Sequence, residues 1–139
     1  MSRRGLRDDD GSVLPLTIGY AVLALALVLV CANATSLYLA QKRLDSVADA
    51  AALAGADGFT LTVSEGGATA VLSDADVQAQ ASEIVDVLEG EATLVAAGTP
   101  DGVSARVTVS GVWHAPIVSL FVPEGVPLSA TATSRTALR

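Results

Sequence analysis

One long apolar stretch dominates the N-terminal part of the chain. From Gly11 to Gln41 the sequence contains no Asp, Glu, Lys, Arg or His, and Val13–Val30 reads VLPLTIGYAVLALALVLV. A helix of about 20 such residues crosses the roughly 30 Å hydrocarbon layer of a bilayer and satisfies its own backbone hydrogen bonds. Pro15 falls near the start, where its missing N–H costs little. The pattern predicts a transmembrane span over about residues 13–34.

The helical pattern continues beyond this span. No proline interrupts the chain from Ala32 to Asp57. A continuous helix over residues 12–57 would be about 69 Å long, about twice the thickness of the membrane, so we expect its C-terminal half to stand outside the bilayer. Apolar residues recur there at three- and four-residue steps, which predicts one apolar stripe. These residues are Leu37, Ala40, Leu44, Val47, Ala51 and Ala54.

Small side chains form two rows along the same predicted helix. Such small-xxx-small rows let two helix backbones approach closely. The first row is Ala32, Ser36 and Ala40, and the second is Ala48, Ala52 and Ala56. An alanine-rich helix also produces these rows by composition alone. Packing on another helix and simple composition therefore both remain open.

The middle of the chain contains one clear helix signal. Phe59–Leu72 carries two short apolar runs around Gly66 and Gly67, and could form either a hairpin or a loop. After it, Ser73 is a candidate N-cap, with Asp76 three residues later. Apolar residues then follow at helical spacing up to Gly90. We expect a short amphipathic helix between Ser73 and Gly90.

Beyond Gly90 the hydrophobic period changes to two. The segments 92–97 and 103–113 flank a turn-forming run, Gly98–Gly102, and residues 126–134 alternate apolar with hydroxyl side chains. These features predict a hairpin followed by a third antiparallel strand. The expected fold class is α+β: a long N-terminal helix, then a small domain over residues 58–139 with one short helix and a three- to four-stranded antiparallel sheet.

Composition excludes several classes of function. The 139-residue chain has a net charge of -7, and its last 82 residues hold only three basic side chains, so we expect no nucleic-acid partner. Cys31 is the only cysteine and His114 the only histidine, which leaves no intramolecular disulfide and no multi-histidine metal site. His114 is far more typical of a strand-end residue than of a general acid or base.

Other candidate chemistry is equally weak. Asp74-Ala75-Asp76 begins like a calcium loop, but the central glycine is missing and Val85 stands where the bidentate Glu would be. A first helical turn explains these carboxylates better. We therefore expect no catalytic residue, no cofactor, no metal site and no small-molecule substrate.

The flanking charges favour one orientation slightly. Arg3, Arg4 and Arg7 precede the span, whereas Lys42 and Arg43 follow it, which favours a cytoplasmic leader over residues 1–11 and an extracytoplasmic C-terminal domain.

A different reading of the same N-terminal segment is a secretory signal. Its cut would follow Ala32-Asn33-Ala34 and would release an exported binding domain. The apolar core is longer than the 7 to 15 residues typical of a cleaved signal. The permanent anchor is therefore favoured.

A family resemblance follows from motifs covering about a third of the chain. They are Gly11-Ser12-Val13-Leu14-Pro15-Leu16, the apolar span, the basic turn YLAQKRL at residues 38–44, and DSVADAAALAGA at residues 45–56. Together they resemble the N-terminal region of the TadE/TadG-like proteins of tight-adherence (Flp) pilus assembly in bacteria. The segment Val107–Arg135, with its apolar patch Ile117–Val122, is more loosely similar to the sheet end of the same proteins.

The resemblance implies a pilin-like fold and a minor-pilin or pseudopilin role. The N-terminal helix would anchor in membrane lipid and pack among other pilins or pilus-assembly proteins. It also implies a candidate processing site between Gly11 and Ser12, where a prepilin peptidase would cut. Leu16 stands where processed pilins carry Glu. This departure favours an uncleaved, membrane-held, TadG-like member.

Overall fold

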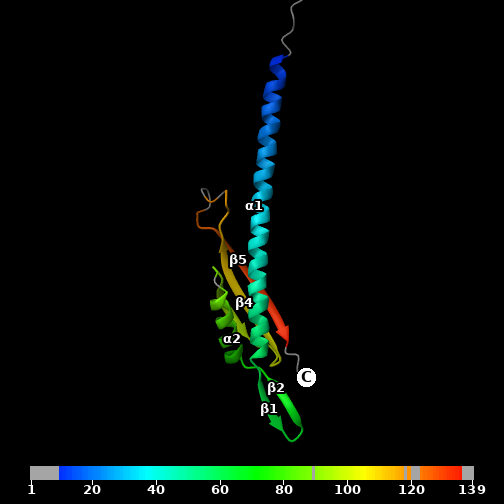
Figure 1. Ribbon diagram of the computed structural model, residues 1–139, viewed down its shortest axis with the longest axis vertical. Helices are drawn as coiled ribbons and strands as arrows, with labels where there is room; N and C mark the ends of the chain where they lie inside the picture. The colour runs from blue at the N-terminus through cyan, green and yellow to red at the C-terminus, as the bar shows by residue number, and fades with distance from the viewer. Residues whose placement is uncertain (1–9, 89, 118, 120–122, 136–139) are drawn as a thin grey trace, which may run out of the picture.

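The fold is that of a computed structural model, which describes residues 10–88, 90–117, 119 and 123–135. Its longest element is helix α1, Asp10–Asp57, which contains 48 residues and measures about 72 Å at the usual helical rise. Only the C-terminal half of α1 lies beside the other elements, and its N-terminal half extends away from them (Figure 1). The predicted continuous helix is confirmed.

The second helix, α2, spans Asp74–Val87. At its start, the Ser73 hydroxyl accepts a hydrogen bond from the Asp76 backbone N–H at 3.2 Å and donates one to the Asp76 carboxylate at 2.6 Å. At its end, the Leu88 N–H donates to the Ile84 carbonyl at 2.9 Å. The predicted N-cap is therefore confirmed, and the helix ends slightly before the expected Gly90.

Three antiparallel strands form the main sheet in the order β3-β4-β5. They are β3 (Thr93–Gly98), β4 (Ser104–Trp113) and β5 (Val126–Arg135). The register of β3 against β4 shifts between Leu94 and Ala96, whereas β4 and β5 pair without interruption. The hairpin and the third strand expected from the two-residue period are confirmed.

The hydrophobic core lies between this sheet and the two helices. The alternation predicted for β4 and β5 places Ala105, Val107, Val109 and Ala130 on the covered face of the sheet. Threonine, serine and arginine side chains occupy the other face, where Thr108 and Thr131 share a hydrogen bond of 2.9 Å. The helices supply the rest of the core. These residues are Leu44, Ala48, Ala51, Ala52 and Ala56 of α1, and Val77, Ala81 and Val85 of α2.

A second, two-stranded sheet extends from the far end of the fold. Strands β1 (Thr60–Ser64) and β2 (Gly67–Val71) pair as an antiparallel hairpin below the C-terminal end of α1 (Figure 1). Gly67, with a φ of 134°, permits the tight connection. The segment that the sequence left open between a hairpin and a loop is thus a hairpin. The α+β class with a three-stranded sheet is confirmed.

Candidate membrane and helix-packing surface

The first part of the candidate surface is an exposed apolar rod, defined as Val13–Val30 of α1. Every side chain in it is exposed, although almost all of them are apolar. The Thr17 hydroxyl donates to the Val13 carbonyl one turn earlier, at 2.9 Å, so this polar group is satisfied within the helix. Within the described part of the chain, α1 is the one helix long and apolar enough to cross a membrane.

Two hydrogen bonds fix the sheet to α1 just beyond the apolar rod. The Trp113 indole N–H donates to the Ser36 hydroxyl at 3.1 Å, and the Gln41 amide donates to the Ser129 carbonyl at 3.0 Å. The Asn33 amide donates to the Leu29 carbonyl at 2.8 Å. Its Oδ1 atom is buried and has no hydrogen-bond partner among the described residues. The sheet is therefore attached at the level where the apolar rod ends.

The two rows of small residues lie in different surroundings. Ala32 is exposed, while Ser36 and Ala40 are partly buried beside the end of β4. The second row, Ala48, Ala52 and Ala56, is buried in the core of its own chain. Gly55 shows how closely the elements approach there, because a Cβ atom added to it would lie 3.0 Å from Val77 Cγ1 and 3.3 Å from Ala105 Cβ. The first row alone leaves an exposed position for another helix.

The proposed processing site lies at the very start of α1. Gly11 and Ser12 both fall within the helix that begins at Asp10. Processing between them stays a prediction.

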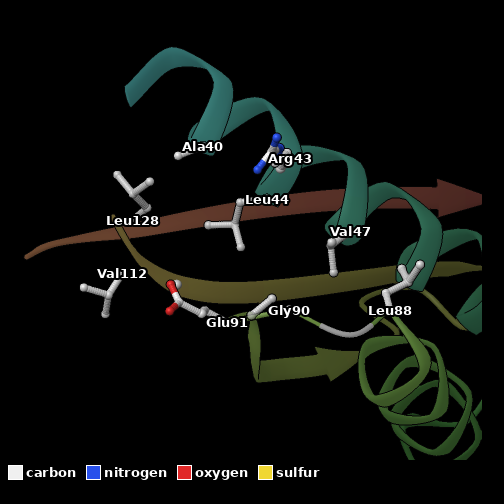
Figure 2. Close-up of a pocket in the computed structure, with 11 residues that line it drawn as sticks. Ala40, Arg43, Leu44, Val47, Leu88, Gly90, Glu91, Val112 and Leu128 are labelled. Atoms are coloured by element: carbon white, nitrogen blue, oxygen red, sulfur yellow. The ribbon is translucent and has the colours of Figure 1, made fainter. Parts of the chain in front are cut away.

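An open groove runs between α1 and the loop that joins α2 to β3 (Figure 2). Its volume is about 420 Å³, and its walls are mostly apolar, with Leu44, Val47 and Leu128 among them. Arg43 on α1 and Glu91 on the opposite wall are its charged side chains. The groove is adjacent to a second hollow that reaches Trp113 and His114.

Two carboxylates on the described surface are stabilised in their charged form. The side-chain hydrogen bond from Gln41, at 3.0 Å, and then the one from Lys42 hold the pKa of Asp45 below its ordinary value. Lys42 and Asp45 form a salt bridge of 3.3 Å. The pKa of Asp101 is lowered mainly by the backbone N–H of Val103 and further by Ser104 and Arg135.

The sequence offered a few residues as candidates for catalysis or metal binding, and the structure shows what surrounds each of them. The Asp74 carboxylate accepts the Thr99 backbone N–H at 2.7 Å and so joins the start of α2 to the end of β3. Asp76 belongs to the N-cap described above, and His114 is exposed. Among the residues that the structure describes, no three His, Cys, Asp or Glu side chains form a group that could hold a metal ion. Cys31 is exposed on α1.

Comparison with known proteins gives one match. Residues 11–58 match the model of the family described as putative Flp pilus-assembly TadE/G-like. No curated protein and no solved structure matches the chain. The predicted resemblance is confirmed over this stretch, which contains nearly all of α1, so the chain carries a TadE/TadG-like N-terminal region. The match supports involvement in Flp pilus assembly.

The looser resemblance of Val107–Arg135 lies outside the matched stretch. Part of its apolar patch, residues 118 and 120–122, also lies outside the described residues. That likeness stays a prediction.

Proposed function

We propose that this protein is a non-enzymatic, membrane-anchored minor pilin or pseudopilin of a bacterial Flp/Tad pilus assembly or a related secretion system. The observation that carries the proposal is the continuity of α1. Its first part is an exposed apolar rod of membrane length. Its second part supplies one side of the hydrophobic core that it shares with the folded head, meaning the described residues from 58 to 135. One rigid element thus joins the lipid layer to the head.

The exposure of the apolar rod supports this role. Soluble monomers rarely expose contiguous apolar patches larger than a few hundred Å². The rod leaves Leu14, Leu23 and Val30 each more than 60% exposed, as it does most of their neighbours. Lipid, or the helices of other pilins within lipid, would remove this surface from water. The three arginines before the rod, against Lys42 and Arg43 after it, slightly favour a leader over residues 1–11 in the cytoplasm and a head outside it.

Partner packing is assigned to Ala32, the exposed member of the first row of small residues, because Ser36 and Ala40 are partly buried beside the end of β4. The second row is occupied by the head of the same chain.

Leu16 lacks the carboxylate that a processed pilin would use to pair with the amine of a neighbour. We therefore assign the protein to a retained anchor rather than to the major subunit of a filament.

The mature N-terminus and membrane association test the anchor. The full-length protein is expressed in a bacterial host, its membranes are washed with alkaline carbonate, and the retained protein is measured by intact mass. We expect retention with an uncut leader. A mass beginning at Ser12 would show pilin-type processing and contradict the retained anchor. A soluble form beginning at Thr35 would show a released domain and overturn the proposal.

Cysteine cross-linking tests the packing surface. In a Cys31→Ser background, Ala32→Cys places a thiol on the exposed row, and Ala52→Cys places a matched thiol in the buried row. When the protein is oxidised in membranes together with its pilus-assembly partners, we expect Ala32→Cys to form disulfide-linked products and Ala52→Cys to form none. Equal cross-linking of both variants, or of neither, would contradict the assignment of the partner surface to the first row.

A further inference from the structure

The end of the main sheet that is nearest to the apolar rod exposes several apolar side chains. We call it the sheet end and define it as Val112 and Trp113 at the end of β4, Ile117 in the connection, and Val126 at the start of β5. Val112, Ile117 and Val126 are all exposed. In Figure 1, β4 ends and β5 begins at the end of the sheet that is nearer to the N-terminal half of α1. The sheet end therefore faces the same direction as the apolar rod.

The level of the sheet end is fixed by its contact with α1. Trp113 donates to Ser36, which comes six residues after the last residue of the rod, Val30. Six residues correspond to about 9 Å along a helix. The headgroup layers make a bilayer about 10 to 15 Å thicker in all than its hydrocarbon core. The rod is about 27 Å long, so a hydrocarbon layer of about 30 Å that begins at Val13 ends about 3 Å past Val30. Ser36 then lies about 6 Å beyond this layer, and Trp113 falls in the headgroup layer, which is about 5 to 7.5 Å thick on that side.

The two ends of the sheet differ sharply in polarity. At the far end, Asp101 and Arg135 form a salt bridge of 3.6 Å. At the sheet end, Glu124 is the charged side chain among the described residues of the connection, and Val112, Ile117 and Val126 expose apolar groups. A lipid surface on this side favours such exposed apolar groups.

Aromatic side chains mark the same level on both sides of α1. Trp113 contacts the side of α1 that bears Ser36, while Tyr38, two residues later and about half a turn around the helix, is exposed. Trp and Tyr are enriched where protein crosses the membrane–water boundary. The first cations after the rod, Lys42 and Arg43, follow about one turn after Tyr38, and the Lys42 ammonium lies 6.0 Å from the centre of the Tyr38 ring.

The sheet end is also closely packed. Gly125 has a φ of 73°, and a Cβ atom added to it would lie 2.5 Å from Val112 Cγ1 and 3.0 Å from the Trp113 carbonyl oxygen. Only glycine permits this approach without strain. The start of β5 therefore packs closely against the end of β4.

We propose that the sheet end rests in the interfacial layer of the phospholipid bilayer that α1 crosses, and so gives the head a second contact with lipid. This inference depends on the proposed function only in that α1 must span the membrane. The second contact restricts tilting of the head about α1 and sets the height at which the head is presented to its partners.

Trp113 is the only tryptophan of the chain, which makes the inference directly testable. The full-length protein is reconstituted into phosphatidylcholine vesicles that contain lipid brominated either near the headgroup end or near the middle of the acyl chain. Bromine quenches indole fluorescence on contact. We expect at least a twofold stronger quenching of Trp113 by the shallow bromine than by the deep one.

Two control proteins calibrate the measurement, both in a Trp113→Phe background. Val63→Trp places the indole on the far hairpin, where the native side chain is 80% exposed, and Leu25→Trp places it in the apolar rod. We expect no quenching of the first and strong quenching of the second by deep bromine. Quenching at residue 25 without quenching of Trp113 would overturn the lipid contact and leave the anchor intact. Absence of quenching at both positions would overturn the anchor as well.

A substitution at the sheet end provides an independent readout. Ile117→Glu adds a charge that disfavours insertion, and Val95→Glu adds the same charge on an exposed residue of β3. We expect Ile117→Glu to weaken shallow quenching of Trp113 at least twofold and Val95→Glu to leave it unchanged. Circular dichroism confirms that both variants keep the fold. Unchanged quenching in folded Ile117→Glu would contradict the proposed contact.

Discussion

Enlarging Ala52 tests whether α1 forms part of the core of the head. The Ala52 side chain is 1% exposed and belongs to the face of α1 that packs under the sheet and α2. Three added carbon atoms in Ala52→Leu would overpack this face, because even a Cβ atom added to Gly55, about one turn later on α1, would lie 3.0 Å from Val77 Cγ1 and 3.3 Å from Ala105 Cβ. Overpacking of this kind typically costs about 1 to 3 kcal/mol.

A loss of this size is readily measured. For a domain of this length each kcal/mol lowers Tm by about 4 to 8 °C, so Ala52→Leu should lower it by about 4 to 24 °C. The full-length protein is heated in non-ionic detergent micelles, and Trp113 fluorescence reports unfolding because its indole is attached to α1 through Ser36.

Ala32→Leu is the matched control for this experiment. Ala32 lies on the same helix but is exposed. Because leucine has nearly the helix propensity of alanine, we expect a change within about 0.5 kcal/mol. If Ala52→Leu unfolds at the same temperature as the native protein, or if Ala32→Leu is destabilised as strongly, the assignment of the buried face is wrong.

Three further predictions concern the head. Val107→Ala removes two carbon atoms from a fully buried side chain and should lower the free energy of unfolding by about 2 kcal/mol, whereas exposed Val95→Ala should change it little; urea unfolding of both variants decides this. Ser73→Ala removes the N-cap of α2 and should cost about 1 kcal/mol in the same assay. The pKa of Asp101 in the folded protein lies below its ordinary value, so the charged carboxylate stabilises the fold. This contribution to the free energy of unfolding is fully present above the pKa of the unfolded state and is lost as the pH falls through the pKa of the folded state. Unfolding measured from pH 7 down to pH about 2 should therefore show a stability decrease that begins below about pH 4 and is smaller in Asp101→Asn.

The sequence predicted most of the regular structure because the signals involved are local. Each of these signals is read from residues that are close together in the chain. They are the uncharged stretch, the helical spacing of Leu44 and Ala51, and the strict alternation along β4. The N-cap at Ser73 follows from a pair of residues three positions apart. Such features depend on neighbours in the chain and need no knowledge of tertiary contacts.

Features that depend on contacts between distant segments could not be predicted. Ser36 and Trp113 are 77 residues apart, and Asp74 meets Thr99 across 25 residues. Likewise, the helical pattern showed two equivalent rows of small residues. Only the packed fold shows that the row of Ala48 faces its own sheet while Ala32 stays exposed. The segment of Leu61 stayed undecided because short apolar runs around two glycines fit a loop as well as a hairpin.

The most direct test of the central claim is the accessibility of engineered thiols in intact cells. In a Cys31→Ser background, Val63→Cys lies on the far hairpin and Leu25→Cys lies in the apolar rod. A membrane-impermeant maleimide added to whole cells should label Val63→Cys rapidly and should leave Leu25→Cys unlabelled until the protein is denatured. Labelling of Leu25→Cys in intact membranes, or labelling of Val63→Cys only after lysis, would contradict an anchor that joins the bilayer to an extracytoplasmic head.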